Sequence, residues 1–186
     1  RDQGFKGVFD GQGYRVKNLN MTYVPFEYNT ISSTYDVFVG LIPVVNKGVV
    51  KNLTVEGGKI HIPSVMPDQD MFYCSPLVGY AREATVINCH NVNCDIVLEN
   101  NGYVGGVVAL NPFHLLNCDN SGNISFDYVN TQENGNQGNG GLSLGGILGY
   151  LSAATTESTK GCDNTAKLMS INGGYSGVGT SNIGGV

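Results

Sequence analysis

One serine of the sequence lies in a motif that is typical of a catalytic nucleophile. Ser143 is the central residue of Gly141-Leu142-Ser143-Leu144-Gly145, which matches the pattern G-x-S-x-G. In hydrolases this motif works at a turn between a strand and a helix, where the turn exposes the hydroxyl. No helical periodicity follows Gly145, so the sequence does not predict such a turn. We therefore interpret Ser143 as a structural residue and expect no catalytic residue here.

Metal ligands would have to come together from distant parts of the chain. The sequence contains neither H-E-x-x-H nor two cysteines at C-x-x-C spacing, and its three histidines lie in dissimilar contexts: His61, His90 and His114. Asp119 and Asp163 occupy equivalent positions in two similar segments, next to Asn120 and Asn164. A calcium ion takes six to eight oxygen ligands, which is more than these residues supply. We favour a solvated polar column without a cofactor, and whether Asp119 and Asp163 bind a metal stays open.

Carbohydrate-cleaving enzymes need two carboxylates, or a cluster of Asp with Arg or Lys, on one face of the fold. The acidic residues of this chain are scattered through its variable segments, and its arginines are only three: Arg1, Arg15 and Arg82. A carbohydrate-active enzyme, such as a polysaccharide lyase or a glycoside hydrolase, is therefore the alternative interpretation and not the preferred one.

Tyrosines in the variable segments could form a ligand-binding surface, because aromatic rings beside Asn and Asp suit sugar or protein ligands. The candidate ligand-binding residues are Tyr23, Tyr28, Tyr35, Tyr73, Tyr103 and Tyr128. The competing interpretation, which we favour, is that these rings cover the apolar flank of the protein's own fold.

A repeated phrase organises the chain. Its clearest copy is GLIPVVNKGVVKNLTVEGGKI, from Gly40 to Ile60, and weaker copies follow. From Asn18 the equivalent position advances by 34, 36, 29 and 44 residues, to Asn52, Asn88, Asn117 and Gly161. Similar phrases at variable spacing are typical of a repeat fold with loop insertions. The insertions fall mainly at 22–37, 61–74, 97–103, 126–143 and 169–181.

Within each copy the apolar residues alternate with polar ones, which is the period of a β-strand. One copy cannot bury its apolar side alone, but copies that pair in parallel, about 4.8 Å apart, can. Parallel crossovers are right-handed in nearly all proteins. The sequence thus predicts an all-β fold: a right-handed parallel β-helix, or β-solenoid, of about five coils with loop insertions, formed by residues 1–186 as a single domain.

Stacked copies would place equivalent residues in columns. One predicted column contains Leu19, Leu53, Cys89, Cys118 and Cys162. A second, at a corner of each coil, contains Asn18, Asn52, Asn88 and Asn117, whose amides can hydrogen-bond along the stack. We expect the three cysteines of the first column to be reduced and buried, because free cysteine behaves as a small apolar residue. A disulfide between Cys89 and Cys118 is the less favoured alternative, because adjacent parallel strands rarely suit its geometry.

Composition supports this fold and excludes some functions. Among 186 residues there are 27 glycines and only 13% charged residues, as expected for short strands joined by tight turns. The net charge of −5 disfavours nucleic-acid binding. No apolar run approaches the ~20 residues that span a bilayer. The five cysteines are too few for a disulfide framework.

The phrases Val39-Gly40-Leu41-Ile42, Val50-Lys51-Asn52-Leu53 and Gly145-Gly146-Ile147-Leu148-Gly149-Tyr150 resemble the GLUG repeat of bacterial cell-surface and secreted proteins, among them immunoglobulin-A-specific metallopeptidases. The segment from Phe5 to Tyr14 resembles the FxGxFDGxGy element that commonly precedes such repeats. In the peptidases the repeats lie outside the catalytic unit.

The resemblance implies a non-catalytic repeat module of a bacterial surface or secreted protein, serving adhesion, ligand binding or spacing. Its implied partners are a host glycan or protein ligand and further repeats or domains of the same chain. Because Ser181 to Val186 begins another copy, we expect the module to be part of a longer surface protein.

Overall fold

The structure is a computed structural model, and it describes residues 4–23, 36–63, 71–100, 102–110, 112–127, 142–151, 158–170 and 181–184. These residues form β-strands β1 to β20 and no helix. All strand pairs are parallel, and the strands lie in three sheets. The expectation of an all-β fold with parallel strands is therefore confirmed.

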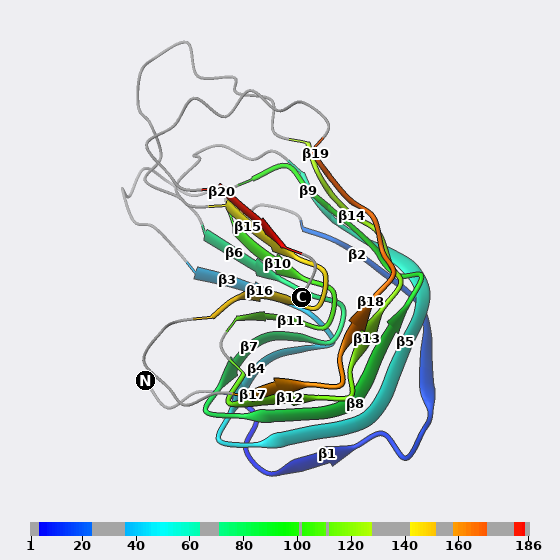
Figure 1. The fold of residues 1–186 in the computed structure, drawn as a ribbon, viewed down its shortest axis with the longest axis vertical. Helices are drawn as coiled ribbons and strands as arrows, with labels where there is room; N and C mark the ends of the chain where they lie inside the picture. The colour runs from blue at the N-terminus through cyan, green and yellow to red at the C-terminus, as the bar shows by residue number, and fades with distance from the viewer. Residues whose placement is uncertain are drawn as a thin grey trace.

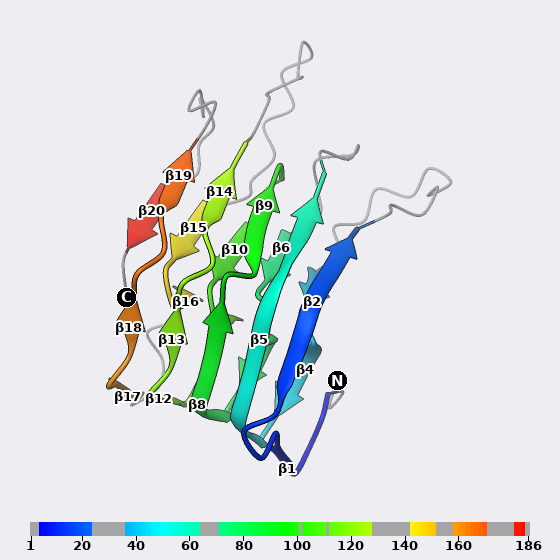
Figure 2. The same ribbon diagram turned by 90° about the vertical axis from the view of Figure 1, so that its right-hand side faces the viewer.

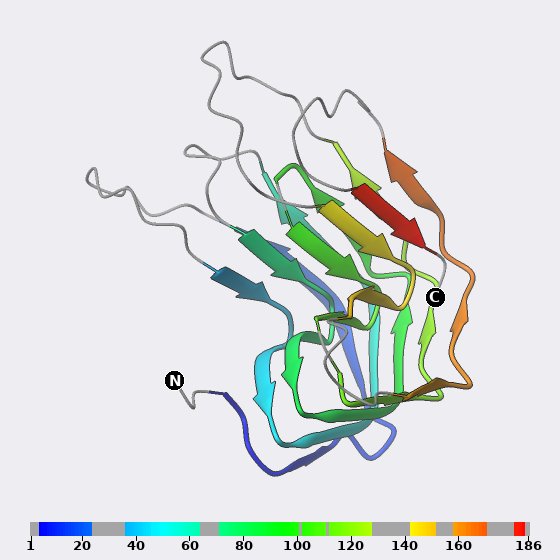
Figure 3. The ribbon, with the colours of Figure 1, turned by 60° about the vertical axis from the view of Figure 1, so that its left-hand side comes forward.

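The first sheet has five strands in the order β3, β6, β10, β15, β20, which lie side by side in Figure 3. Their bounds are Asp36–Val39, Met71–Cys74, Gly102–Gly105, Leu142–Gly145 and Ser181–Gly184. The second sheet has four strands, β4, β7, β11 and β16. Their bounds are Ile42–Asn46, Val78–Arg82, Val108–Leu110 and Leu148–Tyr150. The chain enters the first sheet, turns directly into the second, and then leaves for the third.

The third sheet is the largest and runs along the bottom and the right-hand side of Figure 1. Its strands are β1 (Val8–Asp10), β2 (Arg15–Thr22), β5 (Val49–Ile62), β8 (Thr85–Val92), β9 (Asp95–Leu98), β12 (His114–Leu116), β13 (Asp119–Asn120), β14 (Ile124–Phe126), β17 (Ser158–Lys160), β18 (Asp163–Asn164) and β19 (Leu168–Ser170). Figure 2 shows β2, β5, β9, β14 and β19 side by side. Between the sheets lies the apolar core, which includes the register partners Ile60, Ile96 and Ile124, all fully buried.

The third sheet bends where the repeated phrase carries asparagine. Asn52, Asn88 and Asn117 have φ of 55°, 52° and 52°, and the equivalent Gly161 has φ of 62°. Apart from glycine, asparagine is one of the residue types that best tolerate this left-handed region. The Asn88 Nδ2 donates to Asn52 Oδ1 over 2.8 Å, and the Asn52 Nδ2 donates to Asp10 Oδ1 over 3.0 Å. The predicted column of corner asparagines is therefore confirmed for these three residues.

The predicted positions of Asn18 and Leu19 are wrong. Strand β2 pairs with the second half of β5, so Leu19 lies opposite Gly58 and not opposite Leu53. Strand β1 occupies the place beside the first half of β5 instead. A Cβ at Gly58 would collide with the Leu19 backbone, so the glycine is what permits this approach. Asn18, with φ of 55°, lies beside Gly57, with φ of 69°, at a second bend.

A second column of asparagines, two of them buried, was not predicted from the sequence. Asn91 and Asn120 are each 1% exposed. The Asn91 Nδ2 donates to Asn120 Oδ1 over 2.7 Å, and the Asn120 Nδ2 donates to Asn164 Oδ1 over 3.0 Å. We call these three residues the buried asparagine ladder; Asn164, at its end, is half-buried.

Each amide of the ladder also closes the turn that follows it. Asn120 accepts from the Gly122 N–H and donates to the Gly122 carbonyl, each over 3.1 Å. In the same way, Asn91 accepts from the Cys94 N–H and donates to the Cys94 carbonyl, each over 3.0 Å. A Cβ at Gly106, in the turn between the first and second sheets, would collide with the Asn120 side chain. The repeated Gly-Gly therefore lets this turn pack on the ladder.

Replacing Asn120 by alanine should lower the free energy of unfolding by about 2–4 kcal/mol, because it leaves buried backbone groups at Gly122 and neighbouring amides without a partner. Urea denaturation followed by circular dichroism measures the change. The matched control is Asn20→Ala, which removes one exposed hydrogen bond to the Asn18 carbonyl and should cost less than about 0.5 kcal/mol. Equal effects of the two substitutions would contradict the structural importance of the ladder.

Candidate functional site

Five aromatic rings gather where the first and second sheets meet. They are Phe38, Tyr73 and Tyr103 of the first sheet and Tyr80 and Tyr150 of the second, and we call them the aromatic row. Parallel pairing aligns Phe38 with Tyr73 and Tyr73 with Tyr103. The direct turn between the two sheets brings Tyr80 beside Phe38 and Tyr150 beside Tyr103. The row thus follows the direction in which the strands are paired.

The rings of the row pack on one another. Phe38 stacks on Tyr73 and on Tyr80, with centroids 4.9 and 5.5 Å apart and ring planes at 26° and 21°. Tyr103 stacks on Tyr150 with centroids 4.6 Å apart and planes at 13°. Tyr73 and Tyr103 meet more edge to face, at 5.5 Å and 62°. Two of the stacks, Phe38–Tyr80 and Tyr103–Tyr150, join the first sheet to the second. In each, the tyrosine of the second sheet belongs to the next copy of the repeated phrase along the chain.

The aromatic row is half-buried, and a hydrogen-bond acceptor, the Asp36 carboxylate, lies beside it. Only Tyr150 is exposed, at 38%, and the other four rings are of intermediate exposure. The Tyr73 hydroxyl donates to Asp36 Oδ1 over 3.2 Å. Burial, together with the Asp36 charge, raises the pKa of Tyr73 far above its usual range. Burial also raises the pKa of Tyr103. Tyr73 and Tyr103 therefore stay protonated at neutral pH.

Of the predicted ligand-binding residues, Tyr73 and Tyr103 lie in this row. Tyr23 does not, because its ring packs edge to face on buried Phe72, with centroids 5.0 Å apart. Tyr28, Tyr35 and Tyr128 lie outside the described residues. Three members of the row were not predicted: Phe38, Tyr80 and Tyr150. A usable signal was the Gly-Tyr pair that follows Val78 and Leu148 in equivalent copies.

Ring packing decides what the row can bind. A sugar or an apolar ligand usually stacks on an open ring face. The faces of Phe38 and Tyr103 meet neighbouring rings, so the hydroxyl-bearing edges and the exposed Tyr150 are what the row offers to a ligand. The rings of the aromatic row can therefore cover the flank of the two sheets and also present polar edges to a ligand.

Ser143 lies inside strand β15 and is 6% exposed. Its hydroxyl donates to the Gly149 carbonyl over 2.6 Å and so ties β15 to β16. This position differs from the strand-to-helix turn on which a nucleophile of the G-x-S-x-G type depends. The structure therefore gives Ser143 a structural contact.

Asp119 and Asp163 are register partners in neighbouring strands of the third sheet. Asp119 Oδ2 lies 3.0 Å from His90 Nδ1. The amides of Asn120 and Asn164 are engaged in the buried asparagine ladder, so they cannot join these carboxylates as ligands on the outer face. Within the described ranges, no three His, Cys, Asp or Glu side chains lie close enough together to hold a metal ion.

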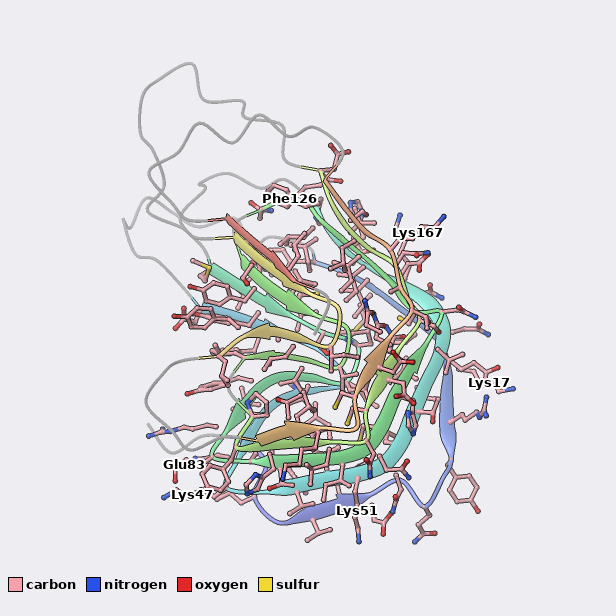
Figure 4. The ribbon with its side chains drawn as sticks, in the orientation of Figure 1. Lys17, Lys47, Lys51, Glu83, Phe126 and Lys167 are labelled. Carbon is pink, nitrogen blue, oxygen red and sulfur yellow. The ribbon has the colours of Figure 1, made fainter. Side chains whose placement is uncertain are left out.

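Several of the described carboxylates pair with bases at separate places. Lys51 lies 3.3 Å from Asp10, and hydrogen bonds from Asn52 and the Gln12 N–H, with Lys51 nearby, lower the pKa of Asp10. Arg15 lies 2.7 Å from Glu56, and its hydrogen bond lowers the pKa of Glu56. Lys47 and Glu83 form another pair, 3.6 Å apart, and lie together in Figure 4, away from Lys17, Lys51 and Lys167. The pairs are surface contacts of modest energy.

The described cysteines are free thiols, and four of the five are buried. Cys89 and Cys118 lie inside the third sheet, where Leu53 is the register partner of Cys89, so this part of the predicted column is confirmed. Cys162 is only half-buried, contrary to expectation. Burial raises the pKa of Cys89 and of Cys94 to about 11. It raises the pKa of Cys74 and Cys118 further.

Comparisons of the chain with protein-family models, with curated proteins and with solved structures find no match. In the described part of the chain, no helix has the length and apolar character that a membrane span requires.

A thiol reagent should label Cys162 first in the native protein, and the four buried cysteines much later. Only the thiolate reacts, and burial both blocks access and keeps these thiols protonated near pH 8, since their pKa values lie far above it. A titration with a chromogenic disulfide measures one fast thiol in native protein and five in urea. Cys162→Ser should abolish the fast phase, and rapid labelling of Cys89 or Cys118 would contradict the expected burial.

Proposed function

We propose that the three parallel sheets are the faces of one right-handed β-solenoid, in which each copy of the repeated phrase makes one coil. The proposal is supported by the order of the strands, because the chain enters the first, second and third sheets in the same sequence in successive copies. Each strand pairs in parallel with the equivalent strand of the neighbouring copy, for example Val50 with Val86 and Leu115 with Val86. Right-handedness follows from the general preference of parallel crossovers.

The module is a non-catalytic repeat scaffold of a bacterial surface or secreted protein, of the GLUG-repeat kind, and it binds a ligand in adhesion. The single observation that carries this proposal is the aromatic row. Repetition has placed five rings in contact along one flank, from Phe38 to Tyr150, and has left hydroxyl-bearing edges and one exposed ring there. Repeat proteins typically use such extended, periodic surfaces for binding.

Its ligand is a host glycan or a protein. Tyrosine suits such a surface because its ring is apolar and its hydroxyl donates and accepts hydrogen bonds. The exposed Asp36 carboxylate, which accepts a hydrogen bond from Tyr73, adds an acceptor beside the row. A scaffold that only separates other parts of the same protein would keep the rings as a covering and bind nothing through them.

The test measures binding of the purified chain to arrays of glycans and of extracellular-matrix proteins. The matched variants are Tyr80→Phe and Tyr150→Phe together, which keep the rings and remove two hydroxyls, and Tyr14→Phe as control. We expect binding that weakens about tenfold, or by 1.4 kcal/mol, in the double variant and is unchanged in the control.

Failure to bind any arrayed ligand, with the protein folded, would favour the spacer role over adhesion. Release of soluble saccharides from a polysaccharide incubated with the chain would contradict the non-catalytic proposal. Reducing-end and unsaturated-product assays on the same preparations measure that release.

A further inference from the structure

Tyr103 and Tyr150 differ from the other ring pairs of the aromatic row, because both partners are phenols and they stack almost in parallel. Their centroids are 4.6 Å apart and their planes meet at 13°. Tyr103 belongs to β10 of the first sheet and Tyr150 to β16 of the second. Tyr150 is 38% exposed, so a small reagent in solution reaches it.

We propose that Tyr103 and Tyr150 form an oxidative modification site, at which a one-electron oxidant joins the two phenol rings into dityrosine. The proposal concerns the chemistry of this pair and does not depend on which ligand the scaffold binds.

The other described tyrosines suit this reaction less well. Tyr80 stacks on Phe38 and Tyr23 packs on Phe72, and neither phenylalanine has a phenol to couple. The ring plane of Tyr73 makes an angle of 62° with that of Tyr103, and the Tyr73 hydroxyl donates a hydrogen bond to Asp36. Tyr14 is 75% exposed, but no ring contact joins it to another aromatic residue of the described ranges. Proximity of two phenols, and not exposure alone, therefore selects Tyr103 and Tyr150.

The oxidant class is a haem peroxidase with hydrogen peroxide. Each phenol loses one electron and one proton and becomes a phenoxyl radical, and the peroxide takes up these two electrons and two protons to give two molecules of water. The two radicals couple through the ring carbons next to their hydroxyls, which forms one carbon–carbon bond. Each coupled carbon then passes its hydrogen to its own ring oxygen, so the rings become aromatic again. The product has lost two hydrogen atoms in total.

Effective concentration explains why the coupling stays within one molecule. Two groups held in contact by a fold react as if each were very concentrated, whereas encounters between molecules depend on dilution. The Ser143 hydroxyl, which donates to the Gly149 carbonyl, already ties β15 to the strand that carries Tyr150. The cross-link would add a covalent tie between β10 and β16, and hence between the first and second sheets.

The experiment treats the dilute, folded chain with peroxidase and a limited amount of hydrogen peroxide. We expect blue dityrosine fluorescence, a monomer on a denaturing gel, and a mass lower by two hydrogen atoms. Peptide mass spectrometry should find that the main cross-link joins the peptides of Tyr103 and Tyr150. The thermal midpoint of the cross-linked monomer should rise, because the tie restricts the unfolded chain.

The key variant is Tyr150→Phe, which keeps the ring and its packing but removes the phenol, and it should reduce the intramolecular product at least tenfold. Tyr14→Phe is the control and should leave the yield unchanged. Circular dichroism verifies that both variants fold. An undiminished yield in Tyr150→Phe, a main cross-link between other tyrosines, or a Tyr103–Tyr150 link that forms only in urea would each overturn the proposal.

Discussion

Parallel pairing between equivalent strands is the interaction on which the rest of this structure depends. It places a residue of one copy beside the same position of the next, at the spacing of neighbouring strands, ~4.8 Å. A residue type is therefore favourable at a given position when two side chains of that type interact well with each other. Isoleucine meets isoleucine in the core, asparagine meets asparagine at the bend, and phenol meets phenol on the flank. The low fraction of charged residues is consistent with this arrangement, because like charges would repel along every column.

The sequence predicts the strands, their parallel arrangement and one asparagine column, because at these positions the residue type and the backbone requirement coincide. A position that needs a left-handed φ accepts asparagine or glycine, and Asn117 and Gly161 show that exchange. The register of β2 could not be predicted in the same way. The phrase around Asn18 resembles the phrase around Asn52, but β5 also bends at Gly57 and so offers a second place to pair.

The candidate site was predictable only in part. Tyr73 and Tyr103 were selected as surface aromatics, but Tyr80 and Tyr150 become neighbours of Phe38 and Tyr103 through the turn between two sheets, which no residue pattern along one strand encodes. The buried asparagine ladder was missed for a similar reason. Asparagine is usually exposed, but Asn91 and Asn120 are buried here because each amide satisfies both the turn of its own copy and the amide of the next.

The lateral order of the strands also determines how the module would respond to a pulling force. In the first sheet each strand is hydrogen-bonded to its neighbours along the order β3, β6, β10, β15, β20. A force that pulls the edge strand sideways, away from its neighbour, loads the strand pairs one after another, as in a zipper. A force parallel to the strands loads all hydrogen bonds of a pair at once. Successive copies are 29 to 44 residues apart, so peeling one copy would release roughly 100–150 Å of extended chain. A stack of parallel strands built in this way would yield in steps and absorb work as it is extended.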